Sequence, residues 1–241
     1  MSTRYYAISD IHGQWGAFRS LLQHFNPETD ILVLMGDYID RGSKSIKVLR
    51  DIVNLVKLYG TDKVKVLLGN HDKMLLDFID NPHQKYMHYA TSGGIHTLQE
   101  VYKMENDSIN GYYDLDPAGI RDLCVKLITP QLDFLRNETL LYYETDKLLF
   151  THAGYDTTKE HWTETEDKDF YWIRKHYENA PTTDLINVFG HTRTSLIRKM
   201  QVTKPYVTDG FIGIDGGSAY GGKLNGLFLS PDGTILETIA V

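Results

Sequence analysis

The stretch Gly36-Asp37-Tyr38-Ile39-Asp40-Arg41-Gly42 follows directly on the apolar run Ile31–Met35. A continuous apolar run of this length predicts a short strand that is buried on both faces, as in a parallel sheet. The seven residues after it hold two carboxylates and a guanidinium group between glycines, where the backbone can turn tightly. Because α/β sheets place their chemistry at the carboxyl ends of strands, we expect Asp37 to offer both of its oxygens to metal.

Strands and helices alternate on both sides of this stretch. Residues 5–9 are predicted to form the first strand, and apolar spacing predicts a helix from about Trp15 to Phe25. Ser43 is expected to cap a second helix that runs to about Tyr59, and residues 64–68 read as the third strand. The order strand, helix, strand, helix, strand predicts an α/β fold in which the strands pair in parallel through crossovers.

The chain after the third predicted strand is expected to be helical at first and then to return to strands. Residues from about 74 to 136 have a helical pattern, and no linker flanks them, so we interpret them as an excursion within a single domain spanning 1–241. Strands follow at 140–144, 147–151 and 185–189. The tail from 207 to 239 alternates short apolar runs with turns, which is typical of an antiparallel meander.

Composition narrows the possible partners and compartments. The net charge of −7 argues against a nucleic-acid polymer as partner, because no basic stripe in the sequence supplies contacts to phosphates. It does not exclude a small phosphorylated substrate. Cys124 is the only cysteine and can form no internal disulfide. Neither a leader segment nor an apolar run near the ~20 residues of a membrane span is visible, so we expect a cytoplasmic protein with no membrane partner.

Metal-ligating residue types recur directly after five of the predicted apolar strands. They are Asp10, His12, Asp37, Asn70, His152 and His191. Oxygen and imidazole ligands in this mixture suit manganese, iron or zinc better than calcium or magnesium alone. The pattern therefore predicts a transition-metal site where the strands end.

The spacing of these residues indicates two ions. Asp10 and His12 are two positions apart, so their side chains point the same way on an extended turn. Asp37 could bridge two ions about 3.5–4 Å apart, the separation used for in-line displacement at phosphorus. Asn70, with the two later histidines, would complete the second ion.

The combined motifs resemble those of the phosphoprotein phosphatase branch of the metallophosphoesterases, in particular its bacterial and phage serine/threonine protein phosphatases. The matching stretches, in the order of the family, are Ser9–Gly13, Gly36–Gly42, Gly69–Asp72, His152–Gly154 and Gly190–Thr192. The tail stretches Asp215–Gly217 and Gly221–Leu224 look similar to the bacterial and phage members as well. Two positions depart from the usual pattern. Ser9 replaces a glycine, and Asp72 stands where many protein phosphatases have glutamate. Aspartate at this second position also occurs in the symmetrical dinucleoside-tetraphosphate hydrolases of this fold.

The resemblance implies a sandwich of two mixed β-sheets flanked by helices, in four αββα layers, with a two-metal centre. Asp10, His12 and Asp37 would hold one ion, and Asp37, Asn70, His152 and His191 the other. A hydroxide activated by the two metals would attack phosphorus. His71 would be the general acid, oriented and kept charged by Asp40, while Arg41 and Arg174 would bind the phosphate oxygens bidentately.

By this resemblance the expected activity is that of a manganese-dependent serine/threonine protein phosphatase, with iron or zinc as alternative metals. The substrate would be a phosphorylated protein or a small phosphoester. The alternative is a dinucleoside polyphosphate hydrolase, such as one acting on diadenosine tetraphosphate. Those hydrolases commonly carry alanine where this chain has Asp40, so the intact Asp40-Arg41 pair favours the protein phosphatase. A catalytically inactive scaffold is disfavoured because no ligand or acid residue is missing.

Overall fold

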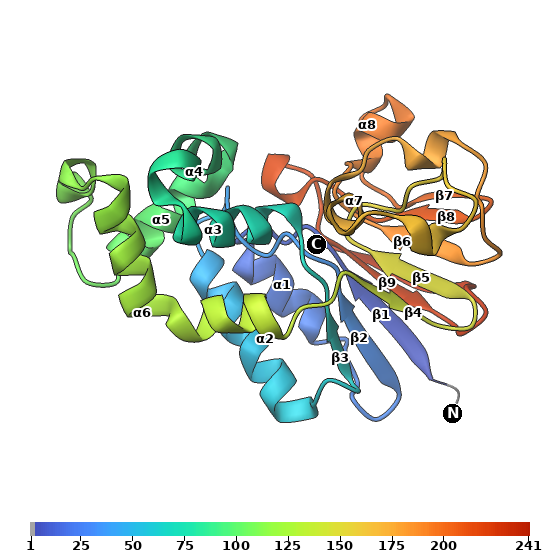
Figure 1. Ribbon diagram of the computed structural model, residues 1–241. Coiled ribbons are helices and arrows are strands. Elements are labelled where there is room, and N and C mark those ends of the chain that lie inside the picture. The colour runs from blue at the N-terminus through green and yellow to red at the C-terminus, as the bar shows by residue number, and fades with distance from the viewer. Residues whose placement is uncertain (1–2) are drawn as a thin grey trace.

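The apolar runs pair into two five-stranded sheets, which the computed structural model, describing residues 3–241, stacks face to face (Figure 1). The first sheet has the order β10-β9-β1-β2-β3. Its strands are β1 (Arg4–Ile8), β2 (Asp30–Leu34), β3 (Val64–Val66), β9 (Asn225–Leu229) and β10 (Ile235–Ala240). β1 pairs in parallel with β2 and antiparallel with β9, so the first strand of the chain lies in the middle of this sheet.

The second sheet has the order β4-β5-β6-β8-β7. Its strands are β4 (Tyr142–Glu144), β5 (Leu148–Thr151), β6 (Ile186–Phe189), β7 (Tyr206–Thr208) and β8 (Phe211–Gly213). The three central strands are parallel and the two edge strands are antiparallel to their neighbours. Both sheets are therefore mixed, and the predicted sandwich of two mixed sheets flanked by helices is confirmed.

The continuous apolar character of the strands follows from burial on both faces. In β1, Tyr5 and Ala7 pack into the core between the sheets, whereas Tyr6 and Ile8 pack against helices on the outer face. Side chains alternate across a strand, so a strand covered on both sides needs apolar residues at every position. This burial fixes the strands rigidly, and their carboxyl ends can then hold polar side chains in place.

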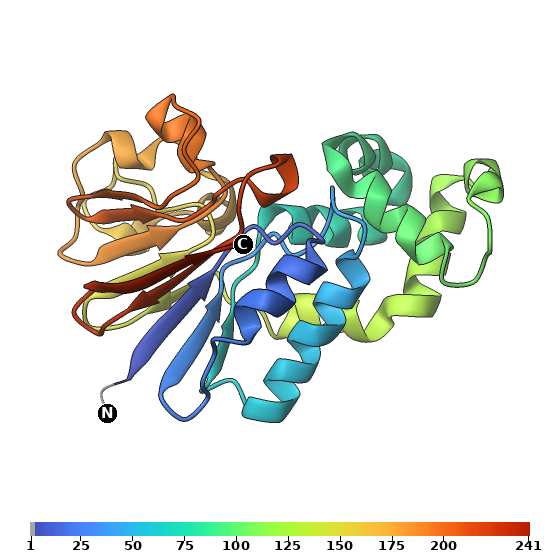
Figure 2. The ribbon, with the colours of Figure 1, turned by 180° about the vertical axis from the view of Figure 1, so that it is seen from behind.

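Helices cover the outside of the sheets. α1 (Trp15–Leu22) and α2 (Ser45–Tyr59) pack on the first sheet, while the short helices α7 (Asp167–Trp172) and α8 (Thr194–Arg198) lie beside the second (Figures 1 and 2). The helical lobe, residues 70–137, projects to one side of the sandwich (Figure 2). It comprises α3 (Asn70–Asp80), α4 (Pro82–Tyr89), α5 (Ile95–Tyr102) and α6 (Pro117–Asn137). None of the helices within residues 3–241 has the length and apolar character that crossing a bilayer requires.

Two local expectations were wrong. Ser43 does not cap α2, which begins at Ser45 without a side-chain cap. The Ser45 hydroxyl accepts a hydrogen bond from the backbone N–H of Asp40 instead. The tail is not one meander, because β7 and β8 join the second sheet while β9 and β10 join the first. Alternating apolar residues predict a strand, but they do not say which strand it will pair with.

Candidate metal centre and active site

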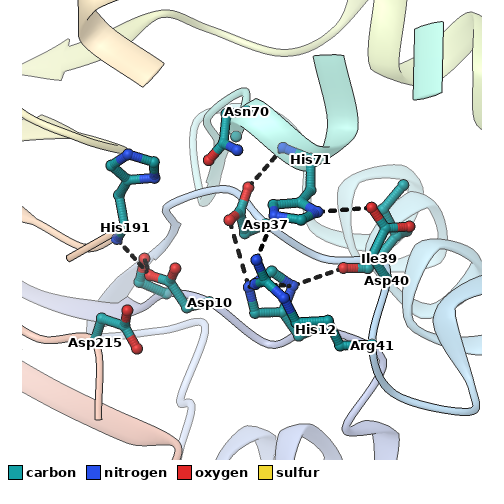
Figure 3. Close-up of polar contacts among 12 residues, drawn as sticks. Asp10, His12, Asp37, Ile39, Asp40, Arg41, Asn70, His71, His191 and Asp215 are labelled. Atoms are coloured by element: carbon teal, nitrogen blue, oxygen red, sulfur yellow. Dashed lines mark hydrogen bonds and ion pairs between the residues drawn. The ribbon is translucent and has the colours of Figure 1, made fainter. Parts of the chain in front are cut away.

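The carboxyl ends of the central strands of both sheets meet at one edge of the sandwich and enclose a pocket of about 110 Å³ (Figure 3). Its lining residues are Asp10, His12, Asp37, Arg41, Asn70, His71, Arg174, His191, Arg193, Leu196, Asp215 and Tyr220. His152 is fully buried directly beside them. The structure thus brings every predicted ligand to one place, together with His71, Arg41 and Arg174.

Much of this site is built on left-handed backbone. Positive φ angles occur at Asp10 (55°), His12 (45°), Asp37 (56°), Asp40 (74°), Arg41 (64°) and His191 (62°). Such a conformation costs a non-glycine residue about 1–2 kcal/mol and persists only where the surroundings enforce it. Backbone hydrogen bonds do so here: the N–H of Asp10 donates to Gly36 at 3.2 Å and that of His12 to Asp37 at 2.9 Å.

Asp37 presents its two carboxylate oxygens to two different histidines. Its Oδ2 lies 3.4 Å from His12 Nε2, and its Oδ1 lies 3.4 Å from His152 Nε2. The backbone N–H of His71 also donates to Oδ1, at 2.9 Å. One carboxylate shared between two imidazoles is the arrangement expected of a ligand that bridges two ions.

The histidine rings are oriented by backbone carbonyls. His12 Nδ1 donates to the Ile39 carbonyl at 2.8 Å, and His152 Nδ1 donates to the Met35 carbonyl at 2.7 Å. Because Nδ1 carries the proton in each ring, the Nε2 lone pair faces the pocket. His191 Nε2 is buried and has no hydrogen-bond partner within residues 3–241. The Nε2 atom of His191 is therefore free to bind a metal, whereas Nε2 of His12 contacts Arg41 and Nε2 of His152 contacts Asn70.

The protonation states also fit a metal centre. Burial lowers the pKa of His12 to about 3 and that of His191 well below its usual value, so both rings are neutral, as metal ligands must be. Burial raises the pKa of Asp10 and of Asp215; the carboxylate of Asp37 adds to the effect on Asp10, and that of Asp10 adds to the effect on Asp215. A divalent cation would offset this crowding of carboxylates.

Two groups of side chains have ligand atoms close enough to share an ion. One consists of His12, Asp37 and His71, and the other of Asp37, His152 and His191. Asp37 belongs to both, as the sequence predicts. The first group differs from the expected set in that it contains His71 in place of Asp10. Asp10 Oδ2 accepts hydrogen bonds from Ser9 Oγ at 2.6 Å and from the His191 N–H at 2.9 Å.

His71 forms a dyad with Asp40. Its Nδ1 donates to Asp40 Oδ2 at 2.7 Å, and both side chains are buried. Burial works against a charge on the His71 ring, but the carboxylates of Asp37 and Asp40 outweigh it and raise the pKa of the imidazole. The other oxygen of Asp40 accepts hydrogen bonds from Tyr89 Oη at 2.8 Å and Thr97 Oγ1 at 2.7 Å. The helical lobe therefore holds the dyad in position.

The two predicted arginines both reach the pocket. The Arg41 guanidinium contacts His12 Nε2 and lies 2.7 Å from His71 Nε2. A protonated His71 Nε2 cannot accept from Arg41, so charging of this ring and withdrawal of the guanidinium are linked. His12 likewise can ligate metal only after Arg41 moves aside. Arg174 is exposed at the rim, with Nη1 3.4 Å from Thr192 Oγ1.

Four further residues matter to the site and were not assigned to it from the sequence. The Asp72 carboxylate accepts three backbone N–H groups, from Asp37, Tyr38 and Gly69, and so ties two site loops together. Asp215 also lines the pocket, and so do Arg193 and Tyr220. A signal existed for Asp215, which follows the apolar strand β8 just as the predicted ligands follow theirs.

The comparisons with known proteins agree with this architecture. Residues 3–208 match the calcineurin-like phosphoesterase family. Two curated relatives are symmetrical bis(5'-nucleosyl)-tetraphosphatases. The one from Buchnera aphidicola subsp. Schizaphis graminum is 31% identical over 170 residues, 67% of this chain and 50% of that protein. The one from Photorhabdus laumondii is 36% identical over 157 residues, 64% of this chain and 44% of that protein. The chain spans about half the length of these relatives.

Solved structures show the same fold at low identity. One with a provisional description as a diadenosine tetraphosphatase has a TM-score of 0.64 at 18% identity, covering 100% of this chain and 94% of its own. The cold-active protein tyrosine phosphatase of a Shewanella species has a TM-score of 0.59 at 18% identity, covering 99% and 80%. At this identity the likeness extends to the fold alone.

The expectation of a serine/threonine protein phosphatase is wrong, because the curated relatives are named as tetraphosphatases. The wider metallophosphoesterase assignment is confirmed, whereas the phosphoprotein phosphatase branch is not. The preference over the tetraphosphate hydrolase rested on the intact Asp40-Arg41 pair. In the structure the Asp40 carboxylate accepts hydrogen bonds from His71, Tyr89 and Thr97 and is not among the residues that line the pocket, so it makes no contact that distinguishes the two substrate classes.

Proposed function

The chain belongs to the calcineurin-like phosphoesterase family, and on that premise we propose that it hydrolyses dinucleoside tetraphosphates at the centre of the phosphate chain. The observation that carries this proposal is the similarity to the two curated relatives that are named as symmetrical tetraphosphatases. Symmetrical cleavage of a dinucleoside tetraphosphate releases two nucleoside diphosphates. The reaction is hydrolysis of one phosphoanhydride bond.

The donor set of the pocket supports a dinuclear centre for this reaction. The residues that would hold the ions are Asp10, His12, Asp37, Asn70, His152 and His191, with Asp37 shared. Two bound divalent ions would activate water and offset the charge of the attacked phosphate. We propose manganese, with iron or zinc as alternatives, because the set mixes imidazole nitrogens with carboxylate and amide oxygens.

The other side chains of the pocket have roles that follow from their contacts. His71 is within the pocket and faces Asp40 through its second nitrogen, so its charged form would stabilise or protonate the oxygen of the departing diphosphate. Asp40 would hold the ring in that orientation. Arg41 and Arg174, which both line the pocket, would bind phosphate oxygens through charge-assisted hydrogen bonds.

Product analysis on the manganese-loaded protein tests the proposal. Diadenosine tetraphosphate should yield adenosine diphosphate as the sole nucleotide product, with kcat/KM at least about tenfold above that for a phosphoserine peptide, a barrier difference of about 1.4 kcal/mol. An Asp37→Asn preparation purified in the same way controls for contaminating hydrolases. Release of triphosphate with monophosphate, or faster turnover of the phosphopeptide, would contradict symmetrical tetraphosphatase activity.

A further inference from the structure

A third arginine, Arg193, lines the pocket beside the two already described. It follows the Gly190–Thr192 stretch directly and stands just before α8. Its guanidinium carbon lies 4.1 Å from the centre of the Tyr220 ring, a cation–π distance. Among residues 3–241 this guanidinium forms no ion pair and no hydrogen bond, so its donors remain available to a ligand.

The position of Arg193 is fixed from two sides. Its side-chain stem packs over Gly217, where an added Cβ would lie 3.2 Å from Arg193 Cδ. Tyr220 belongs to the 3-10 turn Ser218–Tyr220, drawn orange-red between α4 and α8 in Figure 1. This turn is anchored to the metal site, because Ser218 Oγ donates to the Asp10 carbonyl at 2.8 Å. The loop that carries Asp10 thus also positions Tyr220.

Tyr220 gathers two guanidinium groups at one edge of the pocket. Arg41 contacts the same ring, with its guanidinium carbon 5.1 Å from the ring centre. Burial raises the pKa of Asp215 and the Arg193 charge opposes this rise, yet neither guanidinium forms an ion pair with a carboxylate among residues 3–241, so both can bind an anion in the pocket. Arg41 reaches the two imidazoles of the site, whereas Arg193 points to the pocket from the α8 side.

We propose that Arg193, braced on Tyr220, binds the phosphate adjacent to the one under attack, and so makes the pocket prefer phosphoanhydride chains to phosphomonoesters. Arg41 and Arg174 already provide two guanidinium groups for the attacked phosphate. A third, displaced toward Tyr220, matches the extra negative charge of a chain of phosphates. This inference rests on the proposed function for its substrate class, but the site itself needs only an anionic chain.

Inhibition by phosphate chains of different length tests this role without a nucleotide. Hydrolysis of p-nitrophenyl phosphate by the manganese-loaded protein would be inhibited with orthophosphate or with tripolyphosphate at fixed free metal. Arg193→Ala should raise the inhibition constant of tripolyphosphate by about 10- to 100-fold, the size of a lost hydrogen bond to a charged group. The constant for orthophosphate should change less than threefold. Calorimetric binding of tripolyphosphate should weaken in parallel.

Matched variants keep the test specific. Arg198→Ala removes the same charge from α8, the helix that follows Arg193, but Arg198 lies over Tyr206 outside the pocket, so neither constant should change. Arg193→Lys keeps the charge without the planar fork and should lose about 3- to 10-fold for tripolyphosphate. Tyr220→Phe should retain the preference for tripolyphosphate, because the aromatic ring of Tyr220 and not its hydroxyl contacts the guanidinium. Tyr220→Leu removes the ring and should reduce the preference.

The outcomes separate this inference from the proposed function. Equal weakening of both inhibitors by Arg193→Ala would place Arg193 with the attacked phosphate and overturn the inference, and so would no change in either. If the unmodified protein fails to cleave diadenosine tetraphosphate but Arg193→Ala still weakens tripolyphosphate selectively, the inference stands and the proposed function falls. If the unmodified protein cleaves the tetraphosphate but Arg193→Ala does not weaken tripolyphosphate selectively, the proposed function stands and the inference falls.

Discussion

At the scale of single residues, Asp37 is the side chain that joins the two halves of the pocket. Each of its oxygens faces a different imidazole, and its own backbone is held in the left-handed region by contacts from the neighbouring loops. Its N–H donates to Asp72 at 2.8 Å. The same residue therefore links the chemistry of the site to the loops that build it.

Asp37→Asn should lose both metal ions rather than one. An amide has a single oxygen acceptor and no charge, so it cannot serve two cations at once. Metal analysis after dialysis should show the metal-to-protein ratio falling from about two to near zero. Asp77→Asn, which removes an exposed carboxylate paired with Lys73, should keep the full content. An Asp37→Asn protein that retains two equivalents would rule out the bridging role.

Tyr89 contacts the His71–Asp40 dyad from outside the pocket. Its hydroxyl donates to Asp40 at 2.8 Å, and Asp40 in turn holds His71. Tyr89→Phe should lower kcat about 3- to 10-fold and leave KM within twofold, because the dyad loosens while the phosphate-binding groups stay. Tyr86→Phe is the matched control on the same helix, since its hydroxyl faces Tyr112. An equal effect of both variants would mean that Tyr89 contributes only to stability.

At the scale of elements, the Gly93-Gly94 turn is where the helical lobe contacts the site. The Gly93 carbonyl accepts from the Arg41 N–H at 3.1 Å, and Gly93 has a φ of 112°. At Gly94 an added Cβ would lie 2.5 Å from the Tyr89 ring. The two glycines allow a close approach between the lobe and the Asp40-Arg41 turn.

Gly94→Ala should therefore destabilise the protein and impair catalysis together. Overpacking of this kind costs about 1–3 kcal/mol, and the Tyr89 ring that supports Asp40 would be the group displaced. Denaturant unfolding and kcat measured on the same preparations check both effects. Gly16→Ala in α1, where a new Cβ meets nothing within 4 Å, should instead stabilise by up to about 1 kcal/mol. Equal stability of the two variants would contradict this packing.

Sequence reasoning succeeded for elements whose signal is local. Asp10, Asp37 and His191 each follow an apolar strand within a few residues, and the parallel order of β1, β2 and β3 follows from strand–helix alternation. The supports of Asp40 could not be found in this way. Tyr89 and Thr97 lie 49 and 57 positions from it and meet it only through helix packing.

Pairing over long distances explains the other misses. The division of the tail between two sheets depends on which edge each strand meets, and alternation carries no such information. The Arg193–Tyr220 contact likewise joins two loops that only the folded chain brings together. The choice between protein and nucleotide substrates failed because Asp40 faces His71 and not the pocket, so its presence carries no information on the substrate.

At the scale of the whole molecule, the second sheet buries a histidine that makes the fold sensitive to acid. His176 packs edge-on against Phe189, with ring centres 4.5 Å apart, and neither ring nitrogen has a hydrogen-bond partner within residues 3–241. Burial lowers its pKa to about 3, although the nearby Asn187 side chain opposes this. The ring is therefore neutral in the folded protein at neutral pH.

The free energy of unfolding should fall as the pH drops from about 6.5 to about 3. In that window the unfolded chain binds a proton on His176 that the folded chain excludes, so stability is complete above the unfolded pKa and is lost toward the folded one. Denaturant unfolding of His176→Leu should show a shallower loss, by up to several kcal/mol at the acid end. His24→Gln, at an exposed position, should retain the steep slope. Parallel curves for the protein and its His176→Leu variant would contradict the assignment.

The central place of β1 also has a consequence for synthesis on the ribosome. One edge of β1 stays unpaired until β9 is translated, more than 200 residues later. The hydrogen bond from Ser218 to the Asp10 carbonyl can form only at about the same time. At ~5–20 residues per second this exposes an unpaired strand edge for roughly 10–40 s. Nascent chains that are stalled when residues up to 215 have left the exit tunnel should remain sensitive to protease. Chains in which residue 229 has also left the tunnel should gain resistance. Protection that arises before β9 emerges would show that a partner other than β9 covers the edge during translation.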